Sequence, residues 1–473
     1  MKKISRKTKI VCTLGPSTDS KERIKQLIVT GMDVARLNFS HGDHATHGKV
    51  LSLVRQVAQE VGVTVGVLQD LGGPKIRIGN LGPKEVELKT DDRVALAPEG
   101  HVSSVALPVN YPYIIEDVKV GDRILLADGL VELEVEAKEP EKVLCRVILG
   151  GKISSHRGVN LPLSNLRISA FTEKDKKDLL FGLGQGVDFV ALSFVRHAKD
   201  LAPVRDIIDQ SKNSALLIAK IEKPEAMERL ESILDAVDGV MVARGDLGVE
   251  MPLEDVPVVQ KKIIRAAGRA GKPVITATQM LRSMVDSPRP TRAEATDVAN
   301  AVLDGTDALM LSEETAIGEY PVEAVTILNR IARATEKHLH GQHPEYESLS
   351  DRLPVTATTI ARSACIMAED LDAAAIVACT SSGSTARLVA RFRPSCPVLG
   401  LTPNPDTARQ LTMSWGVIPV MAKAFSDTDD IFHQARQRAR EYNIAGPGGK
   451  IVVTAGAPPG RPGTTDLVKV IEV

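Results

Sequence analysis

The sequence predicts an α/β protein: a (β/α)8 barrel of the TIM type, with an inserted antiparallel β-barrel lid domain and a C-terminal α/β domain whose sheet is mostly parallel. Three observations predict this fold. Eight short apolar runs alternate with amphipathic helical stretches, which is the pattern of parallel β/α units. One connection between these units alternates with period two instead. A second series of apolar runs follows a polar stretch late in the chain.

Each of the eight apolar runs has the length of a buried strand. They occupy residues 9–13, 34–38, 64–68, 189–193, 216–222, 239–243, 273–277 and 308–312. Amphipathic helical stretches lie between most of them, for example from Lys21 to Thr30 and from Val256 to Ala270. Eight such units favour a closed barrel, whose chemistry lies at the C-terminal ends of its strands.

The long connection between the third and fourth runs loses the helical period from about residue 72 to residue 167. Residues 85–89 and 131–136 alternate with period two, which predicts an inserted antiparallel β domain over the barrel mouth. We therefore expect the barrel in residues 1–71 and 168–340, and the lid in residues 72–167.

A polar stretch containing Gly, Pro and His, from His338 to Pro354, is typical of a linker. Five further strands are expected beyond it, at residues 374–379, 398–402, 417–421, 450–454 and 467–471. These predict a C-terminal α/β domain in residues 352–473.

Composition excludes several classes of function. The 473 residues carry a formal net charge of −1 and only 3% aromatic residues, so we expect no nucleic-acid partner. No apolar run is long enough to span a bilayer, so we expect no membrane partner. The five cysteines are scattered without CxxC spacing, which fits a reducing cytoplasm.

A candidate metal site follows the fifth and sixth runs. Lys220 and Glu222 are two residues apart, so both side chains lie on one face of a strand. The next run ends in Arg244-Gly245-Asp246, and neighbouring strands would let Glu222 and Asp246 share a divalent cation. Two carboxylates with room for water and substrate oxygens suit Mg²⁺, or Mn²⁺ in its place. If charged residues followed only one strand, the simpler interpretation would be that they are solvated loop residues.

Polar groups gather at the ends of the other strands too. They are Thr13, Gly15, Pro16, Ser17, Arg36, Asn38, Ser40, His41, Asp70, Ser193, Arg196, Thr278, Gln279, Ser312 and Glu314. Arginine, lysine, threonine, glycine amides and a metal pair are the groups that phosphoryl transfer uses. Arg36 can clamp a phosphate bidentately, although a lone arginine in a strand is as often half of an ion pair. His41 alone would be read as a structural histidine, and no Walker A sequence is present.

Several long motifs, in order along essentially the whole chain, resemble the pyruvate kinase family. They are residues 8–17, 36–42, 220–222, 241–250, 277–281 and 289–294. The resemblance implies phosphoryl transfer from phosphoenolpyruvate to ADP, giving pyruvate and ATP, the last step of glycolysis. It also implies a homotetramer.

The resemblance implies roles for individual residues. Glu222 and Asp246 are the expected Mg²⁺ ligands, and Lys220 is the expected transition-state stabiliser. Arg36, Thr278 and the backbone of Gly245 and Asp246 are expected to contact phosphoenolpyruvate. Thr278 and Ser312 are expected near the route by which the enolate is protonated, through water, and the acid itself is not assigned. The expected nucleotide contacts are Thr13, Pro16, Asn38, His41, Arg77 and Lys174.

The chain departs from the common family pattern at two places. Ser312-Glu313-Glu314-Thr315 has Glu313 where glycine is usual, so the backbone there is not expected to need a positive φ. Residues 71–77 have Lys75 where a carboxylate is usual. In the family, lysine at this place accompanies activity without K⁺, so we expect K⁺ not to be required. The residues that match K⁺ ligands, Asn38, Ser40, Asp70 and Leu71, would form a residual site. The alternative is that Lys75 is a solvated hinge residue.

In the C-terminal domain, hydroxyl residues lie between a strand and a helix, at Thr380, Ser381, Ser382, Gly383, Ser384 and Thr385. Free amides at a helix N-terminus can bind an anion, although plain N-capping by these hydroxyls is the simpler alternative. The resemblance implies a phosphorylated effector here. The loop of residues 456–463 could close over it.

Two other functions compete with phosphoryl transfer. A Mg²⁺-dependent aldolase or lyase would share the carboxylate pair, but it has no use for the lid or for the stretch from Thr13 to Ser17. A sugar-phosphate sensor with an inactive barrel would not need Lys220, Glu222 and Asp246.

Overall fold

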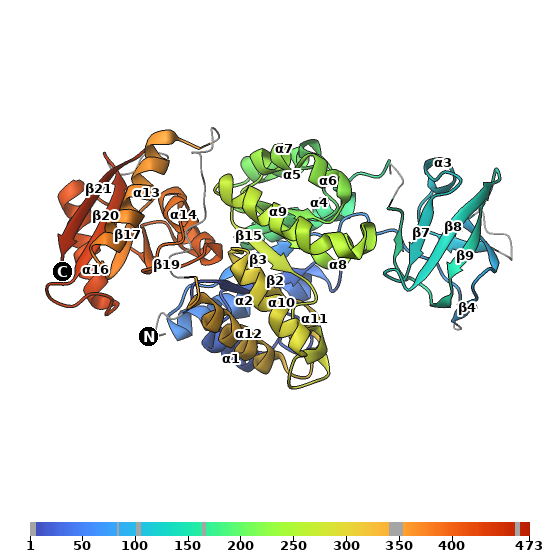
Figure 1. Ribbon diagram of the computed structural model, residues 1–473, viewed down its shortest axis with the longest axis horizontal. Helices are drawn as coiled ribbons and strands as arrows, with labels where there is room; N and C mark the ends of the chain where they lie inside the picture. The colour runs from blue at the N-terminus through green and yellow to red at the C-terminus, as the bar shows by residue number, and fades with distance from the viewer. Residues whose placement is uncertain (1–5, 83–84, 101–105, 163–166, 340–352, 459–463) are drawn as a thin grey trace.

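The computed structural model describes residues 6–82, 85–100, 106–162, 167–339, 353–458 and 464–473. Three bodies lie in a row, with a barrel in the middle, a β-rich lid at one end and an α/β domain at the other (Figure 1). This arrangement confirms the predicted fold class. Most of the expected linker, residues 340–352, and part of the expected closing loop, residues 459–463, lie outside the described residues.

The central body is a closed barrel of eight parallel strands in the order β1-β16-β15-β14-β13-β12-β3-β2. Its strands are β1 (Lys9–Thr13), β2 (Val34–Asn38), β3 (Gly66–Asp70), β12 (Phe189–Leu192), β13 (Leu216–Ile221), β14 (Gly239–Ala243), β15 (Val274–Ala277) and β16 (Ala308–Leu311). Seven agree with the prediction to within a residue. The third begins two residues later than predicted, at Gly66, where a Cβ would lie 2.6 Å from Thr412 Oγ1 and 2.9 Å from Phe189. Asp70 is therefore the last residue of a strand.

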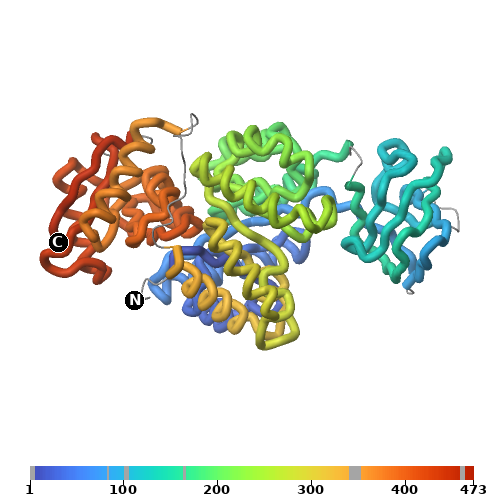
Figure 2. The backbone as a smooth tube through the Cα atoms, in the orientation of Figure 1, coloured from blue at the N-terminus to red at the C-terminus, as the bar shows by residue number. Residues whose placement is uncertain are grey.

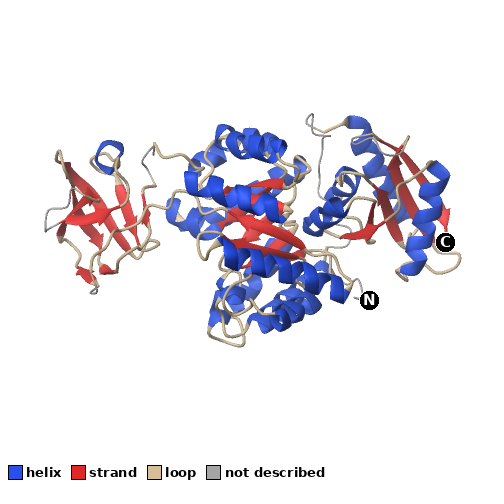
Figure 3. Ribbon diagram, turned by 180° about the vertical axis from the view of Figure 1, so that it is seen from behind, coloured by secondary structure: helices blue, strands red, loops and turns tan. Residues whose placement is uncertain are grey.

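Helices surround this barrel (Figure 3). They are α1 (Lys21–Thr30), α2 (His44–Val61), α4 (Glu173–Gln185), α5 (Ala202–Gln210), α6 (Pro224–Glu228), α7 (Leu230–Ala236), α8 (Arg244–Glu250), α9 (Val256–Arg269), α10 (Arg292–Leu303), α11 (Glu313–Ala316) and α12 (Pro321–Glu336). Capping residues set where several begin: Ser20 caps α1, Asp43 caps α2, and Thr172 and Thr291 form capping boxes for α4 and α10. None of the helices in the described ranges has the length and apolar composition needed to cross a bilayer.

The lid is inserted between β3 and α4, and two segments join it to the barrel (Figure 2). It contains β4 (Val86–Leu88), β5 (Arg93–Pro98), β6 (Ala106–Val109), α3 (Ile114–Asp117), β7 (Arg123–Leu126), β8 (Val131–Lys138), β9 (Val143–Leu149), β10 (Gly151–Ile153) and β11 (Val159–Asn160). The main sheet has the order β11-β7-β8-β9-β5-β6 and is antiparallel except between β5 and β6. Isolated bridges from Arg77 to Gly158 and from Ile78 to Val109 connect its two edges. The sheet therefore curls toward closure around a core of its own.

The C-terminal domain contains α13 (Val355–Asp370), β17 (Ala375–Cys379), α14 (Ser384–Arg391), β18 (Val398–Thr402), α15 (Pro405–Gln410), β19 (Val417–Met421), α16 (Thr428–Glu441), β20 (Lys450–Gly456) and β21 (Thr465–Glu472). Short 3₁₀ turns, η1 to η4, cover Ala198–Asp200, Leu253–Asp255, Arg282–Val285 and Leu411–Met413. The sheet order is β19-β18-β17-β20-β21, and only β21 runs antiparallel. This domain contacts the N-terminal ends of the barrel strands, so the barrel mouth stays on the side of the lid (Figure 1).

Candidate active site

Glu222 and Asp246 come from neighbouring strands, as the sequence predicted. β13 pairs with β14, Glu222 follows the first, and Asp246 lies in the first turn of α8 after the second. Glu222 is 1% exposed and accepts the backbone N–H of Phe194 at 2.7 Å. Burial raises the pKa of Glu222, and the negative charge of Asp246 raises it further against the opposing charge of Lys220. The carboxylates of Glu222 and Asp246 therefore repel each other, and a hard divalent cation between them would remove this repulsion.

Lys220 lies at the centre of the barrel mouth. Its Nζ is 3.0 Å from Glu222 Oε1 and 3.3 Å from Asp70 Oδ1, and it donates to Ser193 Oγ at 2.8 Å. Burial opposes the charged form, but Asp70 and Glu222 outweigh it and raise the pKa of Lys220. The charged ammonium form is therefore favoured, and one hydrogen bond and two ion-pair contacts hold it in position.

Arg36, in β2, is also held in place by an ion pair and hydrogen bonds. Its guanidinium contacts Asp70 Oδ2 at 2.7 Å through Nε and Nη2, and Nη1 donates to Thr13 Oγ1 at 2.8 Å. Thr13 in turn donates to the carbonyl of Leu311 at 2.9 Å. Burial raises the pKa of Asp70, but Lys220 and Arg36 outweigh it and lower this pKa below the usual value. One carboxylate thus orders two cations beside the predicted metal pair.

The turn after β15 carries Thr278 in a strained conformation. Thr278 and Gln279 have backbone φ angles of +68° and +56°, values that residues other than glycine rarely adopt. Thr278 Oγ1 accepts the N–H of Gly245 at 2.7 Å, which joins the ends of β14 and β15. Arg244 holds this turn from behind, donating to the carbonyl of Thr278 at 2.8 Å and contacting Asp297 at 2.6 Å. Arg244 therefore positions the turn, a role that the sequence did not reveal.

Ser312 follows β16 and has a buried Oγ with no hydrogen-bond partner among the described residues. Glu314 fixes its backbone, because Oε2 accepts the N–H of Ser312 at 2.7 Å while Oε1 accepts that of Leu281 at 3.0 Å. Glu313 begins α11, pairs with Arg282 at 2.6 Å, and is absent from the positive-φ residues. The expectation that this position does not need a positive φ is confirmed.

Two of the predicted nucleotide residues, Arg77 and Lys174, are cations, and a third, His41, lies in the turn that follows β2. Burial lowers the pKa of His41, and Arg77, Lys75 and Arg36 lower it further. Arg77, Lys75 and Arg36 therefore disfavour the charged form of His41. Lys174 approaches from α4 and donates to the carbonyl of Phe39 at 2.7 Å.

The other predicted nucleotide residues, Pro16 and Asn38, follow β1 and end β2. The Asn38 side chain accepts the N–H of Ser40 at 3.1 Å.

The expected K⁺ ligands are present but are mostly engaged. Asp70 is bonded to Arg36 and Lys220, and the carbonyl of Leu71 accepts from Ser193 Oγ at 2.8 Å. Lys75 is partly buried and lines the same cavity as Asp246, between the lid and the barrel. Lys75 is therefore more than a fully solvated hinge residue.

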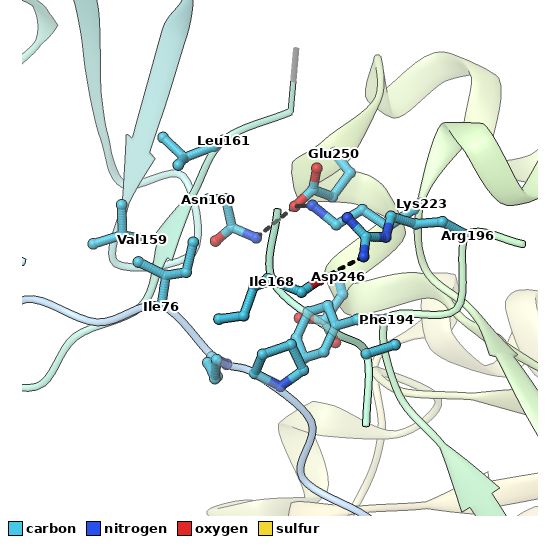
Figure 4. A pocket seen from close by; sticks show the side chains of 13 residues that line it. Ile76, Val159, Asn160, Leu161, Ile168, Phe194, Arg196, Lys223, Asp246 and Glu250 are labelled. Atoms are coloured by element: carbon cyan, nitrogen blue, oxygen red, sulfur yellow. Dashed lines mark hydrogen bonds and ion pairs between the residues drawn. The ribbon is translucent and has the colours of Figure 1, made fainter. Parts of the chain in front are cut away.

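Figure 4 shows this cavity, where the lid meets the barrel. Asn160, from β11 of the lid, donates to Glu250 Oε1 of the barrel at 2.9 Å. Lys223 contacts the same oxygen at 2.6 Å, and Arg196 donates to the carbonyl of Ile168 at 2.6 Å. Asn160, Lys223 and Glu250 could not be recognised as one group from the sequence, because no motif or spacing connects them.

The predicted effector loop lies between β17 and α14. Gly383, with φ of +84°, is the N-cap of α14 and offers no side-chain cap. Thr380 Oγ1 accepts the N–H of Gly383 at 2.9 Å, and Ser382 Oγ donates to Ser384 Oγ at 3.2 Å. These hydroxyls therefore do not act as a plain serine or threonine N-cap of α14. Thr385 contacts Thr465 Oγ1 at 2.7 Å.

Comparison with known proteins agrees with this geometry along the whole chain. A model of the pyruvate kinase barrel domain matches residues 5–325, and a model of the pyruvate kinase alpha/beta domain matches residues 358–471. Pyruvate kinase 2 of Synechocystis sp. is 49% identical over 473 residues, covering 99% of this chain and 79% of that protein. The pyruvate kinase of Clostridium acetobutylicum is 42% identical over 467 residues, covering 98% and 99%.

The chain belongs to the pyruvate kinase family. It is therefore a phosphotransferase, which decides against the aldolase or lyase alternative. The pyruvate kinase of Geobacillus stearothermophilus, 45% identical over 475 residues, covers 99% of this chain and 80% of that protein.

Proposed function

We propose that the chain transfers the phosphoryl group of phosphoenolpyruvate to ADP, giving pyruvate and ATP. The observation that carries the proposal is the partly buried Lys220 ammonium, held between Asp70, Glu222 and Ser193 at the mouth of a pyruvate kinase barrel. A fixed positive charge in a site of low dielectric stabilises negative charge that develops during phosphoryl transfer.

We assign different roles to the residues at the barrel mouth. Arg36 and the Gly245 and Asp246 backbone bind and orient phosphoenolpyruvate, and Lys220 stabilises the charge on the moving phosphoryl group and on the enolate oxygen. Thr278 and Ser312 lie toward the route of protonation, which runs through water. Thr13, Pro16, Asn38, His41, Arg77 and Lys174 bind the ADP phosphates.

Glu222 and Asp246 would hold Mg²⁺, or Mn²⁺ in its place, and the observation that fits them to a cation is Glu222 Oε1, a buried oxygen without a hydrogen-bond partner among the described residues. The ion, when bound, supplies charge neutralisation of substrate oxygens. No group of three or more His, Cys, Asp or Glu that could hold a metal occurs in the described part of the chain. With two carboxylates, water and substrate would supply the remaining oxygens around Mg²⁺.

We further propose that K⁺ is not required, because the Lys75 ammonium supplies the positive charge that a bound K⁺ would supply. The support is its position: it lines the cavity with Asp246 and lowers the pKa of His41. A phosphorylated effector at Thr380 to Thr385 and a homotetramer complete the proposal. We also propose three domains: the barrel in residues 1–71 and 168–340, the lid in residues 72–167, and the C-terminal α/β domain in residues 352–473.

One assay tests the central proposal. Pyruvate formation from phosphoenolpyruvate is followed with and without ADP, at saturating Mg²⁺. We expect pyruvate and ATP in equal amounts, and none without ADP. Pyruvate formed without ADP would indicate a lyase or hydrolase, and no pyruvate under either condition would indicate a sensor with an inactive barrel.

A further inference from the structure

The helix that carries Lys174, α4, is joined to α2 by one buried carboxylate. His44, in the first turn of α2, places Nε2 2.7 Å from Asp178 Oδ1, and Asp178 is only 5% exposed. A carboxylate accepts hydrogen bonds and does not donate them, so this ring nitrogen carries the proton. The His44 ring also stacks on Phe181 of α4, with centroids 4.3 Å apart. His44 is thus held against α4 by a polar and an apolar contact.

The other oxygen of the same carboxylate holds Lys174. Lys174 Nζ is 2.7 Å from Asp178 Oδ2, one turn later on the helix, and it donates to the carbonyl of Phe39 at 2.7 Å. An ammonium has three donors, and these are the two acceptors that it has in the described ranges. The Lys174 side chain is 65% exposed, so the third donor is accessible to a phosphate oxygen.

Asp178 does not follow Lys174 if the lysine moves, because α4 is fixed to the barrel. Gln69 Nε2, from β3, donates to the backbone carbonyl of Asp178 at 2.7 Å. At Gly182, one turn later, a Cβ would collide with the Gln69 side chain, so glycine lets the helix approach the strand closely. The carboxylate therefore has a set position relative to β3, whose last residue is Asp70.

The same turn of α2 supports the loop after β2, in which His41 lies. His47 places Nε2 2.8 Å from the carbonyl of His41, and its ring stacks on Phe39 with centroids 4.1 Å apart. Phe39 is the residue whose carbonyl accepts from Lys174. Two histidines of α2 thus contact the immediate surroundings of two predicted nucleotide residues.

A simpler alternative is that Lys174 and Asp178 form an ordinary ion pair four residues apart on a helix, which contributes little to stability. Two observations go further. Asp178 is buried, unlike the members of an exposed pair, and its second oxygen is bound by a histidine 134 residues earlier in the chain. A free lysine side chain loses rotamer freedom when it binds a ligand. Anchoring the ammonium before the ligand arrives lowers that cost.

We propose that His44 and Asp178 are positioning residues for ADP. His44 orients the Asp178 carboxylate, and the carboxylate holds the Lys174 ammonium where it meets the nucleotide phosphates. The inference rests on the proposed function, because the nucleotide contact of Lys174 is part of it. Neither His44 nor Asp178 touches the nucleotide in this arrangement, and both act through Lys174.

The first test compares steady-state kinetics of the wild type and His44→Ala, with ADP or phosphoenolpyruvate as the varied substrate. We expect KM for ADP to rise about fivefold, whereas kcat at saturating ADP and KM for phosphoenolpyruvate change less than about twofold. His44→Gln should restore most of the affinity, because its amide can donate to Asp178 in place of the ring. His433→Ala is the control, because His433 is exposed on α16 and should leave KM unchanged.

A double-mutant cycle shows whether His44 acts through Lys174. Lys174→Met alone should raise KM for ADP about tenfold, the loss expected for one charge-assisted contact. Adding His44→Ala should raise it no further, because no ammonium is left to position. Asp178→Asn should likewise have no added effect in Lys174→Met. Lys177→Met, an exposed lysine on the same helix, is the matched control and should leave the effect of His44→Ala intact.

Isothermal titration calorimetry with MgADP, without phosphoenolpyruvate, repeats the comparison in the absence of turnover. A wild type that forms no pyruvate would therefore contradict the proposed reaction, while the titration still tests the positioning. Equal ADP affinity in the wild type and His44→Ala would overturn the inference. Effects of His44→Ala and Lys174→Met that add, or equal rises of KM for both substrates in His44→Ala, would also overturn it, because both indicate a general structural role.

Discussion

At the scale of single residues, the site is organised by Asp70 as much as by the residues of the family motifs. This carboxylate is 1% exposed and contacts both Arg36 and Lys220. The two cations are therefore in place before any substrate arrives, and preorganised charge is the main source of electrostatic catalysis.

Lys220→Met should lower kcat by at least about a hundredfold while leaving the affinities for Mg²⁺ and phosphoenolpyruvate within a few fold. The reason is that the ammonium acts mainly on charge present in the transition state. Turnover and ligand affinity are compared directly, with Lys199→Met, an exposed lysine, as the control. A variant that keeps its turnover and loses binding would remove Lys220 from this role.

Glu222→Gln and Asp246→Asn should each raise the Mg²⁺ concentration needed for half-maximal activity by about tenfold or more, because each removes one of two protein charges that hold the ion. In both variants the repulsion between the carboxylates disappears as well, so thermal stability without Mg²⁺ should not fall. A Mg²⁺ titration that is unchanged in either variant would show that the ligands are misassigned.

Lys75 is tested by exchanging its charge. The wild type should show near-full activity without any monovalent metal ion, with tetramethylammonium holding the ionic strength. Lys75→Glu should lose activity in that buffer and regain part of it with K⁺, because the carboxylate removes the tethered charge and offers a cation ligand. Strong activation of the wild type by K⁺ at fixed ionic strength would contradict the proposal.

At the scale of elements, the strand ends and the turns that follow them were the most predictable part of the molecule. The spacing of Lys220 and Glu222 was enough to place both on one face, and the order of the runs was enough to make β13 and β14 neighbours. Other features could not be predicted, because they depend on contacts between distant segments. Arg244 directly follows a barrel strand, beside the candidate metal ligand Asp246, but it holds the Thr278 turn, and its partner Asp297 is 53 residues away.

The junction of lid and barrel illustrates the same limit. Asn160 and Glu250 are 90 residues apart, and nothing in the local sequence of either indicates the other. Glu250 also pairs with Lys223, so a single buried carboxylate connects β11 to the barrel. The Asn160 amide therefore contributes to the orientation of the lid.

Asn160→Ala should loosen the lid by about 1 kcal/mol, the usual net value of one hydrogen bond, and lower kcat/KM about fivefold. Hydrogen exchange should become faster in residues 76–78 and 158–161, where the lid joins the barrel. Asn80→Ala is the control, because Asn80 is an exposed lid residue that bonds only the N–H of Gly82 in its own turn. Equal exchange rates in the two variants would mean that this bond does not hold the lid.

At the scale of the whole molecule, the barrel separates the lid from the C-terminal domain. The lid lies at one end of the molecule, and the C-terminal domain lies at the other (Figure 1). An effector bound to the C-terminal domain can change phosphoenolpyruvate affinity only if two states of the molecule differ at both sites.

Screening sugar phosphates and AMP should find a ligand that shifts the phosphoenolpyruvate affinity of the wild type about fivefold or more. Thr380→Ala with Ser382→Ala should abolish that response, because the turn would lose the hydroxyls that bond Gly383 and Ser384. Basal activity without effector should stay unchanged. A double variant that responds as fully as the wild type would place the effector elsewhere.

The contacts beneath the barrel limit how freely its domains can be exchanged. Asp188 accepts the N–H of Val67 at 2.7 Å and also Arg409 of the C-terminal domain at 2.7 Å. Asp307 likewise accepts the N–H of Val274 at 3.0 Å and contacts Arg393 at 3.0 Å. Each aspartate contacts both a barrel strand and an arginine of the C-terminal domain. Removing that domain would take away Arg393 from Asp307 and Arg409 from Asp188, which would keep only Arg55 of the barrel at 2.8 Å among the described residues. Chimeras that recombine this barrel with another regulatory module therefore need arginines at these two points if they are to be expressed as stable proteins.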